Sequence, residues 1–360
     1  MRICYLANAT SVHSIKMARF FASEGHEVHF ISFEKPLKNE NGITFHVIKT
    51  NGIILCLTFL LKAVQIKKLI HLIQPDIIHA HYLTKYGIIA LIIGFHPCVV
   101  SVIGSDILID AKGVRKIPAI MVLRYADCIH CDGKNSLKEI LSYGIPPQKV
   151  RLIYFGVDVN LFSPATRNIS NHENKKISII STRKLENLYD ITSLIDAVSI
   201  IKQSFRDFIV MIIGSGSQME MLQKKARDLS ILDYVKFYGI VPNDELPNYL
   251  VSADIYVSTS LSDAGIAVST AEAMACGLPV ISTEGGDNAE WIEDGVNGFV
   301  IPKHSPSTIA EKILILARNT EMRKDFGIRN RRIIEIKFNN SNEMMKILKI
   351  YQELVQGVMT

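Results

Sequence analysis

The fold is decided by residues 253–283, which read ADIYVSTSLSDAGIAVSTAEAMACGLPVIST. An apolar run at Ile255–Ser260 is followed by small residues, by a segment with helical spacing at Ile266–Cys276, and by a second apolar run at Pro279–Thr283. Parallel strands that helices cover on both faces have such continuous apolar runs. The stretch therefore predicts a strand, a crossover helix and a parallel strand.

The same alternation extends along the whole chain of 360 residues, of which 48% are hydrophobic and 21% charged. Thirteen strands are predicted: Arg2–Asn8, Glu27–Phe33, Ile43–Ile48, Asp76–His81, Cys98–Gly104, Asp127–Asp132, Val150–Tyr154, Ile177–Thr182, Phe208–Gly214, Val235–Gly239, Ile255–Ser260, Pro279–Thr283 and Gly298–Ile301. A polar linker, 166–176, separates the first seven from the last six. The class is therefore α/β, with two doubly wound parallel-sheet domains at 1–165 and 166–340 and a C-terminal helix at 341–360 that can pack back on the first domain.

Composition excludes several classes of protein. The hydrophobic content excludes disorder, and six irregularly spaced cysteines predict reduced thiols and a cytoplasmic protein. The first apolar run is too short for a signal peptide. Lysines interrupt the apolar stretch Ile53–Ile73, and Ile88–Phe95 is shorter than the roughly 20 residues of a membrane span.

Positive charge is concentrated in the first half of the chain. Residues 1–165 carry 18 Lys and Arg against 11 Asp and Glu, whereas the remainder carries 22 against 24. Such asymmetry is typical of contact with an anionic membrane, an anionic substrate or nucleic acid, and it also occurs without function. No interleaved aromatic and basic pattern supports nucleic acid. The basic, apolar helix expected at Ile53–Ile73 favours either an anionic membrane surface or an ordinary helix with solvated lysines.

Three turns after predicted strands are candidate ligand contacts, since ligands of doubly wound sheets bind at the C-terminal strand ends. Gly214 and Gly216 allow close backbone approach, or form only a tight turn. The turn Gly265, Ile266 and Ala267 opens a helix whose amides can bind an anion. Glu272, two turns inside that helix, is either a ligand for hydroxyl groups or a surface residue. Arg183 and Lys184 are exposed cations that suit a diphosphate, unless they are ordinary surface residues.

A family resemblance adds to these observations. Residues 232–302 resemble the C-terminal domain of glycosyltransferase family 4 in Tyr238-Gly239, Ala253–Val257, Glu272–Ile281 and Asp294–Gly298. The resemblance extends to Gly214-Ser215-Gly216, to Gly156-Val157-Asp158 and to Pro75–His81. It implies the GT-B fold, in which two Rossmann-like domains face each other across a cleft. It also implies a retaining enzyme that uses a nucleotide sugar, with the donor on the second domain and the acceptor on the first.

The resemblance assigns roles to individual residues. Glu272 is similar to the glutamate that holds the donor ribose, Arg183 to the diphosphate-binding arginine, and the amides of 265–267 to contacts with the diphosphate and sugar. The family's first glutamate would fall at Ala264, so we expect Asp263 to contact the transferred sugar instead. The usual lysine would fall near Leu188, and Lys184 is its substitute. The diphosphate leaves without help from a metal in this interpretation, and no cofactor is expected.

In the first domain, the loop that carries Ser11 and His13 replaces the family's Gly-Gly loop, and Ile103-Gly104 replaces a His-Gly pair. Ser11, His13 and His81 are expected on the acceptor side. Asp106, at a strand end, either positions or deprotonates an acceptor hydroxyl or caps the next helix. The acceptor is expected to be a glycan, a lipid-linked glycan or a lipid.

A metal site is not expected. Cys128-Ile129-His130-Cys131 and the pair His79 and His81 have no second pair to complete four ligands, and strand alternation points the two cysteines to opposite faces. Two other functions remain open on the same fold: a nucleotide-sugar epimerase or hydrolase, and a non-catalytic subunit that has lost the motif residues at Ala264, Leu188 and Ile103.

Overall fold

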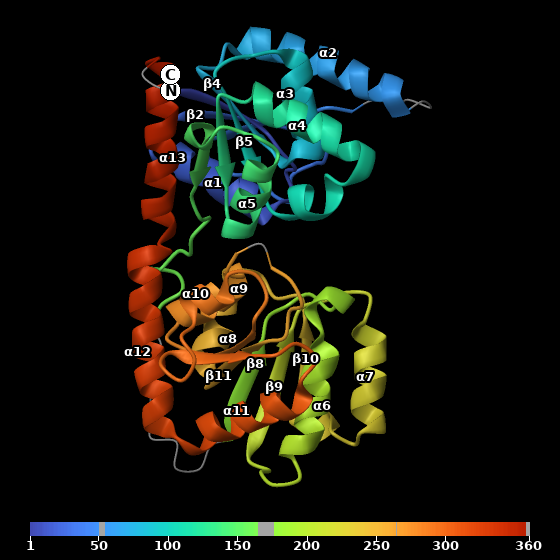
Figure 1. Cartoon of the computed structure of the whole chain (residues 1–360), viewed down its shortest axis with the longest axis vertical. Coiled ribbons are helices and arrows are strands. Elements are labelled where there is room, and N and C mark those ends of the chain that lie inside the picture. The colour runs from blue at the N-terminus through green and yellow to red at the C-terminus, as the bar shows by residue number, and fades with distance from the viewer. Residues whose placement is uncertain (50–54, 165–175, 264, 358–360) are drawn as a thin grey trace. The chain divides into compact units, whose positions relative to one another are not determined.

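The computed structural model describes residues 1–49, 55–164, 176–263 and 265–357, and it divides into two compact units, Met1–Phe155 with Ser341–Thr360 and Gly156–Asn340. Each unit is a parallel sheet with helices on both faces (Figure 1). The α/β fold class is therefore confirmed, and each predicted strand is present. Residue 264 and most of the predicted linker lie outside the described residues.

The first unit is built on a seven-stranded sheet of order β3-β2-β1-β4-β5-β6-β7, in which every neighbouring pair is parallel. Its strands are β1 (Arg2–Leu6), β2 (Glu27–Ser32), β3 (Ile43–Val47), β4 (Ile77–His81), β5 (Cys98–Val102), β6 (Cys128–Cys131) and β7 (Val150–Leu152). Its helical segments are α1 (Val12–Ser23), α2 (Leu55–Ile73), the π-helical turns η1 (Tyr82–Gly87) and η2 (Asp106–Asp110), α3 (Ile88–Ile93), the 3-10 turns η3 (Gly113–Arg115) and η4 (Pro147–Lys149), α4 (Lys116–Tyr125), α5 (Lys134–Ser142) and α13 (Asn340–Val355).

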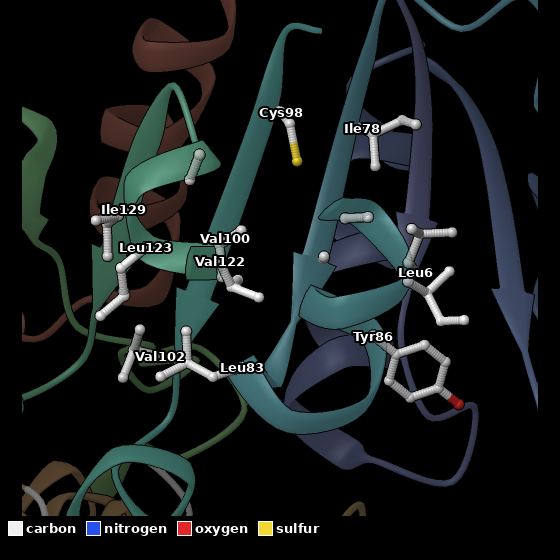
Figure 2. Close-up of a cluster of buried hydrophobic side chains, with 14 of the residues drawn as sticks. Leu6, Ile78, Leu83, Tyr86, Cys98, Val100, Val102, Val122, Leu123 and Ile129 are labelled. Carbon is white, nitrogen blue, oxygen red and sulfur yellow. The ribbon is translucent and has the colours of Figure 1, made fainter. Parts of the chain in front are cut away.

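Two apolar clusters cover the faces of this sheet. One joins the sheet to α2, α3 and α4, and Figure 2 shows its side chains from β4, β5, β6 and α4. The other joins the opposite face to α1 and to α13, which contributes Met344, Ile347 and Tyr351. Helix α1 begins directly after Ser11, whose side chain caps it by accepting a hydrogen bond from the backbone N–H of Ser14.

The second unit is built on a six-stranded parallel sheet of order β10-β9-β8-β11-β12-β13. Its strands are β8 (Ile177–Ser181), β9 (Phe208–Ile213), β10 (Val235–Gly239), β11 (Ile255–Ser258), β12 (Val280–Thr283) and β13 (Gly298–Ile301). Its helical segments are the 3-10 turns η6 (Asn187–Tyr189) and η7 (Leu232–Tyr234), α6 (Ile191–Ile201), α7 (Met219–Asp228), α8 (Leu246–Ser252), α9 (Val268–Ala275), α10 (Asn288–Trp291), α11 (Pro306–Arg318) and α12 (Thr320–Lys337). Helices α6, α7 and α11 form its main core with the sheet.

The units divide at Phe155, whereas the sequence suggested residue 165. The cause is a set of hydrogen bonds that ties the start of the second unit to α12. Val157 N–H donates to Phe338 O (2.8 Å), and Arg331 Nη1 donates to Phe162 O (2.6 Å). Gly156, at φ +70°, lies so close to α13's first residue that an added Cβ would be 2.5 Å from Asn340 Cα.

Candidate active site

Arg183 is the central charge of the site in the second unit. It follows β8, where its Nη2 donates to Asp263 Oδ1 (2.6 Å) and its Nη1 donates to Ser269 Oγ (3.0 Å). The sequence led us to expect an exposed cation, and this was wrong, because Arg183 is only 8% exposed. Burial acts to lower the pKa of Arg183, but Asp263 together with Tyr256 and Tyr189 outweighs it, so the net pKa is raised and the group stays charged.

The ion pair of Arg183 and Asp263 leaves one polar atom of each side chain without a hydrogen bond. Arg183 Nε and Asp263 Oδ2 are buried and have no hydrogen-bond partner among the residues that the structure describes. A buried polar atom without a partner costs about 1–3 kcal/mol. The pair therefore presents one donor and one acceptor that a polar ligand can satisfy.

Helix α9 supplies the neighbouring groups. It begins at Val268, and its N-terminal residue Ala267 offers no side-chain cap, so the N–H groups of its first turn have no intrahelical acceptor. Its amides and the positive end of its dipole favour an anion. Ile266 and Ala267 are buried, and Gly265 O accepts a hydrogen bond from Asp287 N–H (3.3 Å).

Glu272 lies about one turn into α9, nearer the helix start than the two turns that the sequence indicated. It is 5% exposed, which excludes the alternative of a surface glutamate. Ala264, where the family's other glutamate would fall, lies outside the described residues. A ligand's hydroxyl groups can therefore contact this buried carboxylate only if the ligand enters the site.

The glycine turn after β9 supports the Arg183 loop. An added Cβ at Gly214, whose φ is +140°, would lie 2.2 Å from Arg183 O, and one at Gly216 would lie 2.3 Å from Leu185 O. Both glycines are therefore required by backbone packing, and their contact with a donor stays a prediction. Lys184, on the same loop, is exposed.

In the first unit, Ser11 and His81 are linked through Ser14. Ser14 Oγ lies 2.8 Å from His81 Nδ1 and donates to Ser11 Oγ (3.1 Å). Burial lowers the pKa of His81 to about 3 and that of His13 to about 4. His13 stacks on Phe155, with 4.8 Å between ring centres.

Asp106 lies inside the protein at the start of η2. Its Oδ1 accepts from Ile103 N–H (3.0 Å), and its Oδ2 accepts from Leu83 N–H (2.9 Å). Burial raises the pKa of Asp106 to about 6, although these N–H groups oppose the rise. The carboxylate thus holds together the segments that follow β4 and β5.

A cavity of about 220 Å³ lies beside Ser11 at the C-terminal edge of the first sheet. Its lining includes Asn8, Ser11, Glu34, Tyr82, Lys85 and Asp110. The sequence analysis found only Ser11 among them. Glu34 follows a strand, and Asp110 lies in the turn that follows another strand. This position along the chain was the sequence feature that could have indicated both residues as ligand contacts.

The histidines that suggested a metal are engaged in hydrogen bonds. His79 Nε2 and His130 Nδ1 each lie 2.7 Å from Ser101 Oγ, and His130 Nε2 donates to Ile153 O (2.7 Å). Cys128 and Cys131 belong to different apolar clusters, on opposite faces of the sheet. Among the described residues, no group of three or more His, Cys, Asp and Glu side chains is placed to hold a metal ion.

Comparison with known proteins agrees with this architecture. The family model "Glycosyl transferases group 1" matches residues 162–333, and "Glycosyl transferase 4-like" matches residues 2–131. An uncharacterized glycosyltransferase of Methanocaldococcus jannaschii is 28% identical over 91% of this chain and 90% of its own length. The amylovoran biosynthesis glycosyltransferase AmsK of Erwinia amylovora is also 28% identical, over 60% of this chain, and the match spans 54% of AmsK.

Among solved structures, Anabaena HepE in complex with UDP has a TM-score of 0.84, with 20% identity over 98% of this chain and 100% of its own. The two units, their strand orders and the matched ranges define a GT-B glycosyltransferase. The chain belongs to the glycosyltransferases of this fold and is similar to family 4.

Proposed function

We propose that the protein transfers a glycosyl unit from a nucleotide-diphosphate sugar to a hydroxyl group, with retention at the anomeric carbon, in the synthesis of a glycan or glycolipid. The observation that carries this proposal is the buried pair of Arg183 and Asp263 beside the first turn of α9. The name of the AmsK relative supports glycan synthesis, and UDP in the HepE complex supports a nucleoside-diphosphate donor.

The chemistry requires stabilisation of a leaving group. When the bond from the anomeric carbon to the phosphate oxygen breaks, its electron pair stays with the diphosphate, whose negative charge increases. Preorganised cations and N–H groups stabilise such charge most effectively. Arg183 is already held by Asp263 and Ser269, and the amides of α9 add to it, so we propose that no metal is needed.

Retention follows if the acceptor attacks from the face that the leaving group departs from. The new bond joins the acceptor oxygen to the anomeric carbon, and the acceptor's proton passes to the departing phosphate oxygen. This route needs no protein nucleophile, so alanine at position 264 is compatible with it. We propose that Asp106 positions the segments around Leu83 and Ile103, since both of its oxygens already accept hydrogen bonds.

The test is an incubation with UDP-glucose and other nucleotide sugars, with and without oligosaccharide and polyprenyl-phosphate acceptors, followed by proton NMR of the anomeric signals. We expect donor consumption only with an acceptor, and a product with the donor's anomeric configuration. Consumption or isomerisation without any acceptor would identify a hydrolase or an epimerase. No binding of any nucleotide sugar by calorimetry would identify a non-catalytic subunit.

We also propose that the protein works at the anionic, cytoplasmic face of a membrane. The segments 55–73, 82–94 and 113–125, which include α2, α3 and α4, contain seven Lys and Arg and no Asp or Glu. In the first unit, α3 contacts both α2 and α4 (Figure 1). Among the described residues, no helix is long and apolar enough to cross a bilayer.

The same surface carries exposed apolar side chains: Leu60, Leu61, Val64, Leu72, Ile92, Val114, Ile117 and Met121. Val114 is 84% exposed, although large apolar residues are usually buried. An apolar surface whose own charged residues are all cationic complements a bilayer that contains anionic lipids. We call these eight residues and six of the seven cations the α2–α4 surface; the seventh, Lys85, lines the cavity beside Ser11 instead.

A further inference from the structure

The cavity beside Ser11 is a candidate site for the part of the acceptor that receives the sugar. It lies entirely in the first unit, where the segments after β1, β2, β4 and β5 meet. At about 220 Å³ it is smaller than the roughly 300–1,000 Å³ of pockets for drug-sized ligands. It therefore suits one small unit of a larger molecule.

The two carboxylates in the cavity, Glu34 and Asp110, can still accept hydrogen bonds from a ligand. Glu34 Oε2 accepts from Tyr86 O–H (2.8 Å), whereas Glu34 Oε1 has no partner among the described residues. The Asp110 carboxylate forms no hydrogen bond or ion pair within the described part of the chain. Ionised carboxylates only accept hydrogen bonds. They therefore favour a ligand that donates, and they repel an anion.

Donors lie beside these acceptors. Ser11 Oγ already accepts from Ser14 N–H (3.4 Å) and from Ser14 Oγ (3.1 Å), so its own proton is left to donate. Lys85 lines the same cavity, and its ammonium has no partner among the described residues. With two carboxylates and one ammonium, the charged lining sums to −1. A phosphate would need donors alone, whereas a hydroxyl group both donates and accepts.

Tyr86 fixes the position of Glu34. Its ring stacks on Phe33 at 4.8 Å and rests against the core cluster, with its oxygen directed away from that cluster (Figure 2). Tyr86 O–H also accepts from Phe33 N–H (3.2 Å) while it donates to Glu34. The acceptor Glu34 Oε1 is therefore held on a rigid support.

We propose that this cavity binds one uncharged, hydroxyl-rich unit, a pyranose ring or a cyclic polyol, at the end of the acceptor. That this ligand is the acceptor of the sugar rests on the proposed function. The proposal that the cavity binds such a ligand does not. An anionic lipid portion, if the acceptor has one, is bound by the α2–α4 surface and not by this cavity.

The test is saturation-transfer-difference NMR on the full chain with methyl α-D-glucopyranoside, myo-inositol and inorganic phosphate. We expect saturable binding of the pyranoside or of inositol, and no displacement by phosphate. Asp110→Asn and Glu34→Gln should each weaken binding by about tenfold, the loss expected for one charge-assisted hydrogen bond. Glu24→Gln, at the exposed C-terminal end of α1 and outside the cavity, is the matched control and should bind as the wild type does.

Asp110 is exposed, so Asp110→Asn tests the proposal even if Glu34→Gln disturbs Tyr86. Equal binding by the wild type and Asp110→Asn, displacement by phosphate, or no binding of either probe would overturn the proposal. A parallel titration with UDP separates this outcome from failure of the proposed function. Loss of UDP binding alone would reject the donor site and leave the cavity's ligand class standing.

Discussion

The guanidinium of Arg183 is held from three directions, by Asp263, by Ser269 and by the ring of Tyr189, whose centre lies 4.5 Å from the guanidinium carbon. A lysine would keep the charge but would lose the planar fork. Arg183→Lys should therefore fold with a melting temperature near that of the wild type and turn over at least about tenfold more slowly.

Arg183→Ala should behave differently, because it leaves Asp263 buried without its cation. Breaking such a pair costs about 3–5 kcal/mol. The double variant Arg183→Ala, Asp263→Asn should regain much of this stability without regaining activity. Thermal melting and turnover, measured on all three proteins, check this. Normal turnover in a folded Arg183→Lys protein would make Arg183 structural.

Glu272 is buried on α9, where a ligand's hydroxyl groups are its expected function. If it holds the donor, Glu272→Gln should weaken nucleotide-sugar binding by about tenfold or more, since a hydrogen bond to a charged group is worth about 1.5–3 kcal/mol. Calorimetry with the variant measures this. Glu321→Gln, on the exposed face of α12, serves as the control, and unchanged affinity in a folded Glu272→Gln protein would remove Glu272 from the donor site.

At the scale of the elements, the strands were predictable because each is an apolar run between turn residues. The local sequence also explains the start of α1, because Ser11 caps that helix. The burial of Arg183 was not, since its partner Asp263 is 80 residues away and follows a different strand. The cavity was missed for the same reason: Glu34 and Asp110 meet only when the sheet order is known.

A chain of buried hydrogen bonds crosses the first sheet, and its direction is fixed. Ile153 O can only accept, so His130 donates from Nε2 and its Nδ1 accepts from Ser101. Ser101 then accepts from His79 Nε2, and His79 Nδ1 accepts from Tyr351 on α13. This direction of the hydrogen bonds requires both histidines to be neutral. Burial lowers the pKa of His130 to about 4, and that of His79 well below its usual range.

This arrangement predicts a pH dependence of stability. Between the ordinary histidine pKa of about 6.5 and the lowered values near 4 and 3, the unfolded chain binds protons that the folded chain excludes. The free energy of unfolding should therefore fall as the pH falls from about 6.5 toward 4, and it should be insensitive to these groups above pH 7. Urea unfolding at pH 7 and pH 5 measures the change.

His81→Asn is the matched variant, because it removes one of these titrating groups and keeps a polar side chain near Ser14. Its loss of stability between pH 7 and pH 5 should be smaller than that of the wild type. Lys224→Gln, at an exposed position of the second unit that does not titrate between pH 5 and pH 7, should leave the wild-type difference unchanged. An equal loss in the wild type and His81→Asn would show that His81 titrates normally.

At the scale of the whole molecule, the excess charge of the first half, +7 over residues 1–165 against −2 for the rest, includes the six cations of the α2–α4 surface. Helix α2 packs Ala63, Ile66, Ile70 and Ile73 against the core, whereas its exposed side chains include Lys67, Lys68, Leu60, Leu61 and Val64. An ordinary covering helix needs only the inner apolar stripe. The second apolar stripe is what favours a bilayer.

Each basic residue close to an anionic bilayer contributes about 1 kcal/mol, and salt screens this attraction over about 10 Å at 0.1 M. The protein should therefore co-sediment with vesicles that contain phosphatidylglycerol, much less with phosphatidylcholine alone, and release should follow added salt. Replacing Lys67, Lys68 and Arg115 by Gln should weaken binding strongly, whereas Lys224→Gln with Arg329→Gln in the second unit should not.

Val114→Ser and Ile117→Ser should weaken the salt-resistant part of binding, because they remove apolar area and no charge. Equal and negligible binding to both kinds of vesicle at low salt would reject the membrane proposal and leave a soluble glycan as the acceptor.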